Sequence, residues 1–327
     1  MAKVLGMGNA LVDIMIRIPD EKILEDFNLL KGGMRLVDAA FIQKLMNAVV
    51  HLPAEKAPGG SAANTVNGLS NLGLDTGFIG KVGRDLYGSF MEDDMFENNI
   101  RPILLKGVAP TGLAVALVSP DSERTFAVNL GCAIELTPGD IHPEMFSGFD
   151  YFHIEGYLVQ NHELLRTAIR MAKEAGAKVS LDLASFDVVQ ENLAFLKEIV
   201  RNSVDIIFAN EDEARTFTGL DPEPALHKLY EHCAVSVVKT GKNGSLVKYR
   251  DEVHQIGVID VQSIDTTGAG DLYAAGFLFG LAHGLPVEKC GRIGALAAGK
   301  VIEVLGAKMK PETWKEINKQ VQLIVSD

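Results

Sequence analysis

The sequence predicts an α/β fold, with a mostly parallel central sheet covered by helices on both faces and a small second β-sheet. Two observations support it. Short apolar runs rich in β-branched residues alternate with helical stretches along most of the chain, which is typical of a parallel sheet. Two segments, about residues 16–38 and 100–130, contain strand-like pieces with no helix between them. We expect these two segments to pair outside the main sheet as a lid.

The expected main strands carry Gly, Asn, Asp or Thr near their ends, as strands commonly do. They cover residues 4–18, 76–83, 150–159, 177–185, 204–210 and 234–241. The clearest helix covers residues 162–177, where apolar residues recur with a helical period. In the irregular part, residues 112–130 read as a β-hairpin that turns at Pro120-Asp121-Ser122.

Composition limits the class of protein. The 327 residues, 47% of them hydrophobic, are enough for one large domain over residues 1–327 with a small insertion. A net charge of −12 argues against nucleic acid or an anionic membrane as a partner. We find no apolar run long enough to span a membrane, and Asp13 interrupts the apolar N-terminal segment, which reads as a strand. The three cysteines are too scattered for disulfides or zinc, so we expect a cytoplasmic protein.

Two glycine-containing segments only partly match nucleotide-binding motifs. The segment GMGNAL, residues 6–11, begins like a dinucleotide fingerprint but lacks the third glycine and opens no helix. This argues against a hydride-transfer enzyme. The segment GALAAGKV, residues 294–301, nearly spells a P-loop, but it lies inside a helical pattern and ends in Val301 instead of Ser or Thr. We expect a buried helix there.

The segment DTTGAGDLYAAGF, residues 265–277, predicts an anion site beside a base. A helical pattern follows Gly268-Ala269-Gly270, so Thr267 to Gly270 lie at a helix N-terminus, where unpaired N–H groups and the dipole favour anions. Asp271 falls in the first turn, where the same dipole keeps it ionised. Such a carboxylate can take a hydroxyl proton while the N–H groups stabilise a phosphoryl group in transfer. The simpler alternative is that Asp271 only caps its helix and the glycines only turn the chain.

A second glycine turn precedes a helix in PGGSAANTVNGLSNLG, residues 58–73. Gly59 and Gly60 allow a ligand to approach the backbone closely. Asn64 offers both a donor and an acceptor, which suits sugar hydroxyls. An early GG-x-x-x-N and a late D-x-x-G-A-G-D in one α/β chain form a specific pair.

These two segments resemble the two signatures of the ribokinase-like (PfkB) family of carbohydrate and nucleoside kinases, and the resemblance runs over nearly the whole chain. It implies an α/β domain with a β-sheet lid, and it implies ATP and Mg²⁺ as cofactors. By resemblance, Asp271 is the catalytic base, Gly268, Ala269 and Gly270 form the anion hole, and Thr267 contacts ATP.

The resemblance also implies a nucleotide side. Asn210 to Glu213 is similar to the family's Asn-x-x-Glu motif, which organises magnesium and phosphate. Asn210 is then assigned to ATP, and Glu213 to Mg²⁺ through water. Lys239-Thr240-Gly241 resembles the segment that meets the nucleotide. Without the resemblance, the first segment would read as an acidic helix start and the second as a turn.

The acceptor side looks more like adenosine kinases than sugar kinases. In the opening GMGNALVD, Asn9 and Asp13 match their pattern, and the resemblance implies that Asp13 holds ribose hydroxyls. It also implies that Arg124 of the hairpin reaches the phosphates, and Tyr157 is a candidate aromatic face for a purine. The simpler alternatives are that Asp13 is a polar residue at a strand end, that Arg124 lies at an exposed hairpin tip, and that Tyr157 is a core tyrosine. The sequence SAAN departs from the polar run of eukaryotic adenosine kinases.

We therefore expect a magnesium-dependent kinase that moves the γ-phosphoryl group of ATP to a primary hydroxyl of a nucleoside such as adenosine. A kinase of free ribose, fructose or a related sugar is the first alternative. A non-catalytic ligand-binding protein on the same fold is the second, and the intact Asp271 counts against it. Potassium as a further cofactor, and a monomer or a lid-mediated homodimer, stay open.

Overall fold

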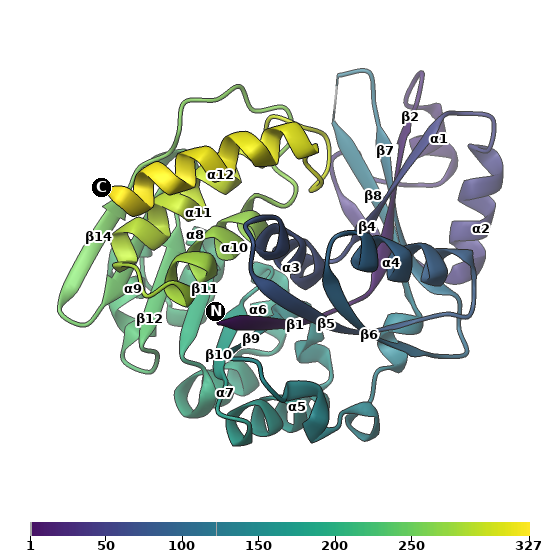
Figure 1. Ribbon diagram of the computed structural model, residues 1–327. Helices are drawn as coiled ribbons and strands as arrows, with labels where there is room; N and C mark the ends of the chain where they lie inside the picture. The colour runs from purple at the N-terminus through teal and green to yellow at the C-terminus, as the bar shows by residue number, and fades with distance from the viewer. Residues whose placement is uncertain (1, 122) are drawn as a thin grey trace.

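The computed structural model describes residues 2–121 and 123–327, and its centre is a nine-stranded, mostly parallel sheet (Figure 1). The strand order is β14-β13-β12-β11-β10-β9-β1-β5-β6. Every neighbouring pair from β6 to β12 is parallel, and β13 and β14 add an antiparallel edge. The strands are β1 (Lys3–Met7), β5 (Asp75–Val82), β6 (Ile100–Lys106), β9 (Tyr151–Glu155), β10 (Lys178–Asp182), β11 (Ile206–Asn210), β12 (Val235–Lys239), β13 (Ser245–Tyr249) and β14 (Glu252–Ile256). The predicted fold class is confirmed.

A five-stranded second sheet lies beside the main sheet, with order β3-β8-β7-β2-β4 (Figure 1). Its strands are β2 (Leu11–Arg17), β3 (Met34–Leu36), β4 (Ala54–Gly59), β7 (Thr111–Val118) and β8 (Arg124–Gly131). Helices α1 (Lys22–Asp26) and α2 (Ala39–Ala48) cover one face, where Ile14 and Val115 pack with Leu24 and Leu45. The other face stays available to the site described below.

The observed strands differ from the predicted ranges in several places. The apolar run 4–18 is two strands, because it leaves the main sheet after β1 and enters the second sheet as β2. Residues 100–106 form β6 of the main sheet, α1 lies within 16–38, and β4 completes the second sheet. Strands β7 and β8 form the predicted hairpin, and Ser122 in its predicted turn lies outside the described residues.

Helices cover both faces of the main sheet, as predicted. One face carries α5 (His162–Glu174), α6 (Phe186–Glu191), α7 (Leu193–Ser203), α8 (Glu211–Thr218) and α9 (Pro222–Tyr230). The other carries α3 (Ser61–Asn71), α4 (Leu86–Glu97), α10 (Ala269–Ala282), α11 (Val287–Val301) and α12 (Pro311–Ser326). Short 3₁₀ helices are η1 (Cys132–Glu135), η2 (Pro138–Asp140), η3 (Pro143–Phe146), η4 (Gly156–Gln160) and η5 (Gly241–Asn243). Residues 294–301 lie in α11, so the near-P-loop is a helix as expected.

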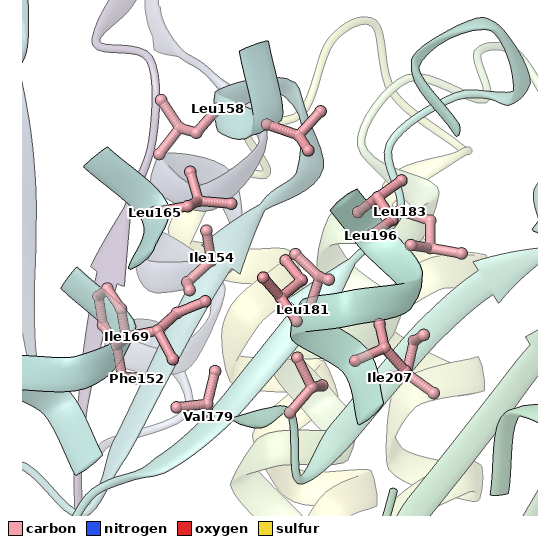
Figure 2. Close-up of a cluster of buried hydrophobic side chains, with 14 of the residues drawn as sticks. Phe152, Ile154, Leu158, Leu165, Ile169, Val179, Leu181, Leu183, Leu196 and Ile207 are labelled. Carbon is pink, nitrogen blue, oxygen red and sulfur yellow. The ribbon is translucent and has the colours of Figure 1, made fainter. Parts of the chain in front are cut away.

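The strands alternate their side chains between two cores. Figure 2 shows Phe152 and Leu181 of the sheet packed with Leu165 of α5 and Leu196 of α7. A neighbouring strand residue, Phe208, points to the opposite face and joins the core under α10 and α11. Burying one such side chain contributes about 1.5–3 kcal/mol, so these cores fix the positions of the strand ends.

The last residues of β9, β10, β11 and β12 are Glu155, Asp182, Asn210 and Lys239, and they meet at one edge of the sheet. Ligands of open α/β sheets bind at this edge. Within the described ranges, no helix combines the length and apolar character needed to cross a bilayer.

Candidate active site

A cavity of about 780 Å³ lies where the carboxyl ends of the main strands face the second sheet. It brings together eleven of the residues predicted for the site: Asn9, Asp13, Gly60, Asn64, Tyr157, Asn210, Glu213, Lys239, Thr267, Gly270 and Asp271. Six others do not line it: Gly59, Arg124, Thr240, Gly241, Gly268 and Ala269.

Asp271 lies in the first turn of α10, and both of its carboxylate oxygens are hydrogen-bonded from α3. The Ser61 hydroxyl donates to Oδ1 at 2.7 Å, and Asn64 Nδ2 donates to Oδ2 at 2.9 Å. Thr65 Oγ1 also donates to the backbone carbonyl of Asp271, at 3.2 Å. The two helices of the glycine-rich segments therefore hold this carboxylate in one orientation at the cavity wall.

Burial raises the pKa of Asp271 to about 6, and the hydrogen bonds from Ser61 and Asn64 oppose that rise. Burial thus works against the effect expected of the helix dipole, although the group is still mainly ionised at pH 7. A pKa close to neutral suits a group that accepts a proton during a reaction.

The loop before α10 presents backbone N–H groups beside this carboxylate. Gly268 has φ 76°, and a side chain there would also press against Ala307, which explains the glycine. The N–H of Ala269 donates to Thr266 O at 3.2 Å, so that group is already bonded. Within residues 2–121 and 123–327, the N–H groups of Gly268, Gly270 and Asp271 have no acceptor. Unbonded N–H groups at a helix start suit an anion.

Arg124 connects the second sheet to this loop. Its guanidinium donates to both carboxylate oxygens of Asp265 and to Thr267 Oγ1, the latter at 2.9 Å. Asp265 is fully buried and also accepts from the N–H groups of Thr267 and Gly306, each at 2.6 Å. The alternative of an exposed hairpin tip is wrong, because the Arg124 side chain is only 11% exposed.

Glu155, which we did not predict, organises the other end of the cavity. It accepts hydrogen bonds from the N–H and Nδ2 of Asn9, both at 2.8 Å, and from the N–H of Ala62 at 3.0 Å. Burial raises its pKa to about 7. Its bond to the Asn9 N–H explains the break between β1 and β2, because this backbone group is taken from the strand ladder. The signal in the sequence that could have identified Glu155 was a glutamate near the end of an expected apolar strand.

Asp13 projects from β2 into the cavity and has no hydrogen-bond partner among the described residues. Burial raises its pKa to about 7, and the positive charge of Lys308 opposes the rise. Gly59 allows this position, because a Cβ there would overlap the Asp13 carboxylate. Gly60, at φ 100°, caps α3, and a Cβ there would overlap the carbonyl of Asn9. The carboxylate is thus left available to a ligand.

On the other side of the cavity, Asn210 and Glu213 form a capping box at the start of α8. Asn210 Nδ2 donates to Glu213 Oε1 at 2.6 Å, and the Glu213 N–H donates back to Asn210 Oδ1 at 2.9 Å. The segment is therefore a helix start, as the simpler alternative held, and both side chains also face the cavity. Burial and the nearby Asp182 charge raise the pKa of Glu213 to about 7.

Lys239 Nζ donates to Asp182 Oδ2 at 2.8 Å. We did not predict Asp182 as a residue of the site. Thr240 and Gly241 form a turn, with the Thr240 N–H donating to Gly244 O at 2.7 Å. Tyr157 is partly buried at the cavity wall, and burial raises its pKa to about 12. Within the described ranges, no three His, Cys, Asp or Glu side chains are grouped to hold a metal ion directly.

Residues 50–314 match the family described as pfkB family carbohydrate kinase. The fold is similar to a probable sugar kinase from Rhizobium etli CFN 42, with 33% identity, a TM-score of 0.88, and 98% and 99% of the two chains covered. The fold is also similar to adenosine kinase from Sinorhizobium meliloti, with 34% identity, a TM-score of 0.87, and again 98% and 99% of the two chains covered. A 5-dehydro-2-deoxygluconokinase from Geobacillus thermodenitrificans is 28% identical over 299 residues, which are 84% of this chain and 89% of that protein.

These relatives differ in the acceptor that their names give, but all are named as kinases. The match covers both glycine-rich segments, Pro58 to Gly73 and Asp265 to Phe277. The second supplies the carboxylate and the N–H groups described above, and the first supplies the Ser61 and Asn64 donors that hold the carboxylate. The chain belongs to the pfkB carbohydrate kinase family and is a kinase of sugars or nucleosides.

Proposed function

We propose that this kinase transfers the γ-phosphoryl group of ATP to the primary hydroxyl of a ribonucleoside, with adenosine as the favoured acceptor. The observation that carries the proposal is the cavity itself. It holds Asp271 and Asp13 together with an apolar wall from the second sheet, and a nucleoside has the matching polar sugar and apolar base.

The apolar wall comes from inward-facing side chains of the second sheet. They are Leu11, Met34, Leu36, Ala114, Phe126, Val128 and Leu130. A free sugar carries hydroxyls on most sides and gains little from such a surface. A purine buries its faces there, and stacking of a base on an aromatic side chain such as Phe126 contributes about 1–3 kcal/mol. This wall therefore supports a nucleoside over free ribose or fructose.

The charge of the cavity supports an uncharged acceptor. Its carboxylates are Asp13, Glu155, Asp182, Asp187, Glu191, Glu213 and Asp271. They outnumber its cations, Arg35 and Lys239. A sugar acid, such as the acceptor in the name of the Geobacillus relative, would be repelled at short range.

In the proposed reaction, the acceptor hydroxyl oxygen forms a bond to the γ-phosphorus while the bond from that phosphorus to the ADP oxygen breaks. The hydroxyl proton goes to Asp271, and the N–H groups of Gly268 and Gly270 bind phosphoryl oxygens. Asp13 holds ribose hydroxyls, and Tyr157 lies against the base. Asn210, Lys239, Thr240, Gly241 and Thr267 are proposed to contact ATP.

Magnesium fits the nucleotide side, because Glu213 supplies hard carboxylate oxygen atoms there and no closed protein cage is formed within the described ranges. When bound, the ion would neutralise phosphate charge, and Glu213 would hold it through water. We also propose that the second sheet is a lid. Its Arg124 contacts the loop before α10 and would reach the phosphates by exchanging Asp265 for them.

The test is to compare kcat/KM for adenosine, ribose, fructose and a sugar acid, with ATP as donor. We expect adenosine to exceed ribose by at least about tenfold, because the base adds its own contact energy. Replacing a wall residue, in Val128→Ser, should reduce kcat/KM for adenosine and leave that for ribose nearly unchanged. If ribose or fructose equals adenosine, the nucleoside assignment is wrong and a sugar kinase takes its place.

A further inference from the structure

The ammonium group of Lys239 has unused hydrogen-bonding capacity. Its side chain is 17% exposed and its partner Asp182 is 10% exposed, so the pair is largely removed from water. Asp182 Oδ2, at 2.8 Å, is its only hydrogen-bond partner within the described ranges. An ammonium has three N–H donors, and leaving such donors unpaired away from water is unfavourable. Two of its donors are therefore available to a ligand.

The ammonium of Lys239 lies beside the N-terminus of α10. A Cβ built on Gly270 would lie 3.1 Å from Lys239 Nζ, so the group touches the first turn of α10. Gly270 has one of the unbonded N–H groups, and the next residue is Asp271. Lys239, Gly270 and Asp271 all face the same cavity. A positive charge thus lies beside the N-terminus of α10, where it would attract an anion bound by the unbonded N–H groups.

The surrounding carboxylates keep Lys239 charged. Burial alone would lower its pKa, but the charges of Asp182 and Glu213 outweigh burial, and the pKa is raised above its ordinary value. The same pairing lowers the pKa of Asp182 against the effect of its burial. Both members of the pair therefore carry their charges.

Asp182 is itself held in place by a strained turn. The N–H of Ala184 donates to Asp182 Oδ1 at 3.0 Å, which leaves Oδ2 for Lys239. Ala184 adopts φ 70°, a left-handed conformation that is unfavourable for a non-glycine residue. Strain of this kind clusters at functional sites, and a buried ion pair is weak as a device for stability alone.

We propose that Lys239 is a catalytic residue whose ammonium binds the transferred phosphoryl group, and that Asp182 is the positioning residue that aims it. This rests on the proposed phosphoryl transfer at this site. The ammonium donates two hydrogen bonds to non-bridging oxygens as the bond to the acceptor oxygen forms and the bond to ADP breaks. It transfers no proton, since the hydroxyl proton goes to Asp271.

The central test is Lys239→Met, measured with whichever acceptor the wild-type enzyme turns over fastest. We expect kcat to fall about 10²–10³-fold, as when one donor to a developing charge is removed, with acceptor KM within about threefold of wild type. The matched control is Lys81→Met. Lys81 is a similarly buried strand lysine, 11% exposed and paired with Asp140 at 2.9 Å, but it lies outside the cavity. Its loss should leave kcat within about threefold of wild type.

The second variant is Asp182→Asn, which keeps the shape but removes the charge that holds the ammonium. We expect kcat to fall roughly tenfold through misalignment. We also expect the variant to lose activity at alkaline pH where the wild type retains it, because the pKa of Lys239 falls. A purely structural role would not move this alkaline limb.

A third readout does not depend on the acceptor. Lys239→Met should weaken binding of a non-hydrolysable ATP analogue at least about threefold and leave ADP binding unchanged, because only the analogue carries a γ-phosphoryl group. If Lys239→Met does not fold, the apolar pair Lys239→Met/Asp182→Leu replaces it in the same assays.

The proposal is overturned if the folded variant keeps kcat within threefold of wild type, or binds the ATP analogue and ADP as the wild type does. A wild-type enzyme that phosphorylates a sugar but not adenosine would instead overturn the nucleoside assignment. If it phosphorylates no acceptor, phosphoryl transfer fails, and the analogue-to-ADP comparison alone decides whether Lys239 binds the phosphoryl group.

Discussion

The hydroxyl of Ser61 donates a 2.7 Å hydrogen bond to Oδ1 of Asp271, joining the first turns of two helices across 210 positions of the sequence. A hydrogen bond to a carboxylate favours its charged form. The bond therefore opposes the rise in pKa that burial imposes on Asp271. A helix from the first third of the chain thereby adjusts the proton affinity of a group near its end.

Ser61→Ala should raise the pKa of Asp271, because the variant removes a bond that favours the charged carboxylate. The acid limb of kcat against pH should move to higher pH. Thr65→Val is the control, since it removes a hydroxyl that reaches the backbone carbonyl of Asp271 and not its carboxylate. An unchanged acid limb in Ser61→Ala, or an equal shift in both variants, would contradict this role.

Asp271→Asn should lower kcat by at least about 10², the lower range for a positioned base, while substrate binding changes little. In the wild type, kcat should rise with pH through about 6, because only the ionised carboxylate accepts the proton. Steady-state rates from pH 5 to 8 measure both effects. A variant with near-wild-type turnover would remove Asp271 from the mechanism.

Asp13→Ala should raise the acceptor KM at least about tenfold, because a hydroxyl bonded to a charged group contributes about 1.5–3 kcal/mol. The ATP KM should stay nearly unchanged. The Asp13 carboxylate has no other hydrogen-bond partner among the described residues, so its removal leaves no protein group unpaired. Equal changes in both KM values would place Asp13 outside the acceptor site.

The same carboxylate should destabilise the ligand-free protein at alkaline pH. Burial raises the pKa of Asp13 to about 7, well above the unfolded value of about 3.9, so the folded protein binds the extra proton. The free energy of unfolding therefore falls as pH rises from about 4 to about 7 and is level above that range. Asp13→Asn should raise Tm at pH 8 by at least about 2 °C and change it little at pH 4. Thermal scans at the two pH values test this, and a shift of equal size at both would refute it.

The fold class could be predicted because alternation and helical periods reflect burial, which dominates in regular elements. The break between β1 and β2, at Gly8 to Ala10, could not be predicted, because the apolar run continues through it. Its cause is Glu155, a residue far along the chain that takes the Asn9 N–H. Strand β6 was likewise misplaced, since its pattern does not say which sheet it joins.

The same limit applies to the site. Asp271 and Asn64 could be predicted because each lies at a fixed short spacing from the glycines of its own segment. Asp182 and Asp265 were missed because each matters through a distant partner, Lys239 in one case and Arg124 in the other. Strand ends converge only when the sheet forms, so such pairs have no local signature.

The interior position of β1 in the main sheet has a consequence for synthesis. This strand pairs with residues 75–79 on one side and residues 151–154 on the other. At about 5–20 residues per second, roughly 7–30 s separate the emergence of β1 from that of its second partner. Val4, Leu5 and Met7, all fully buried in the finished fold, have no partner strand on that side during this time. The first strand of the chain, which ends between two parallel neighbours, therefore waits longer for its second neighbour than any other strand of this sheet.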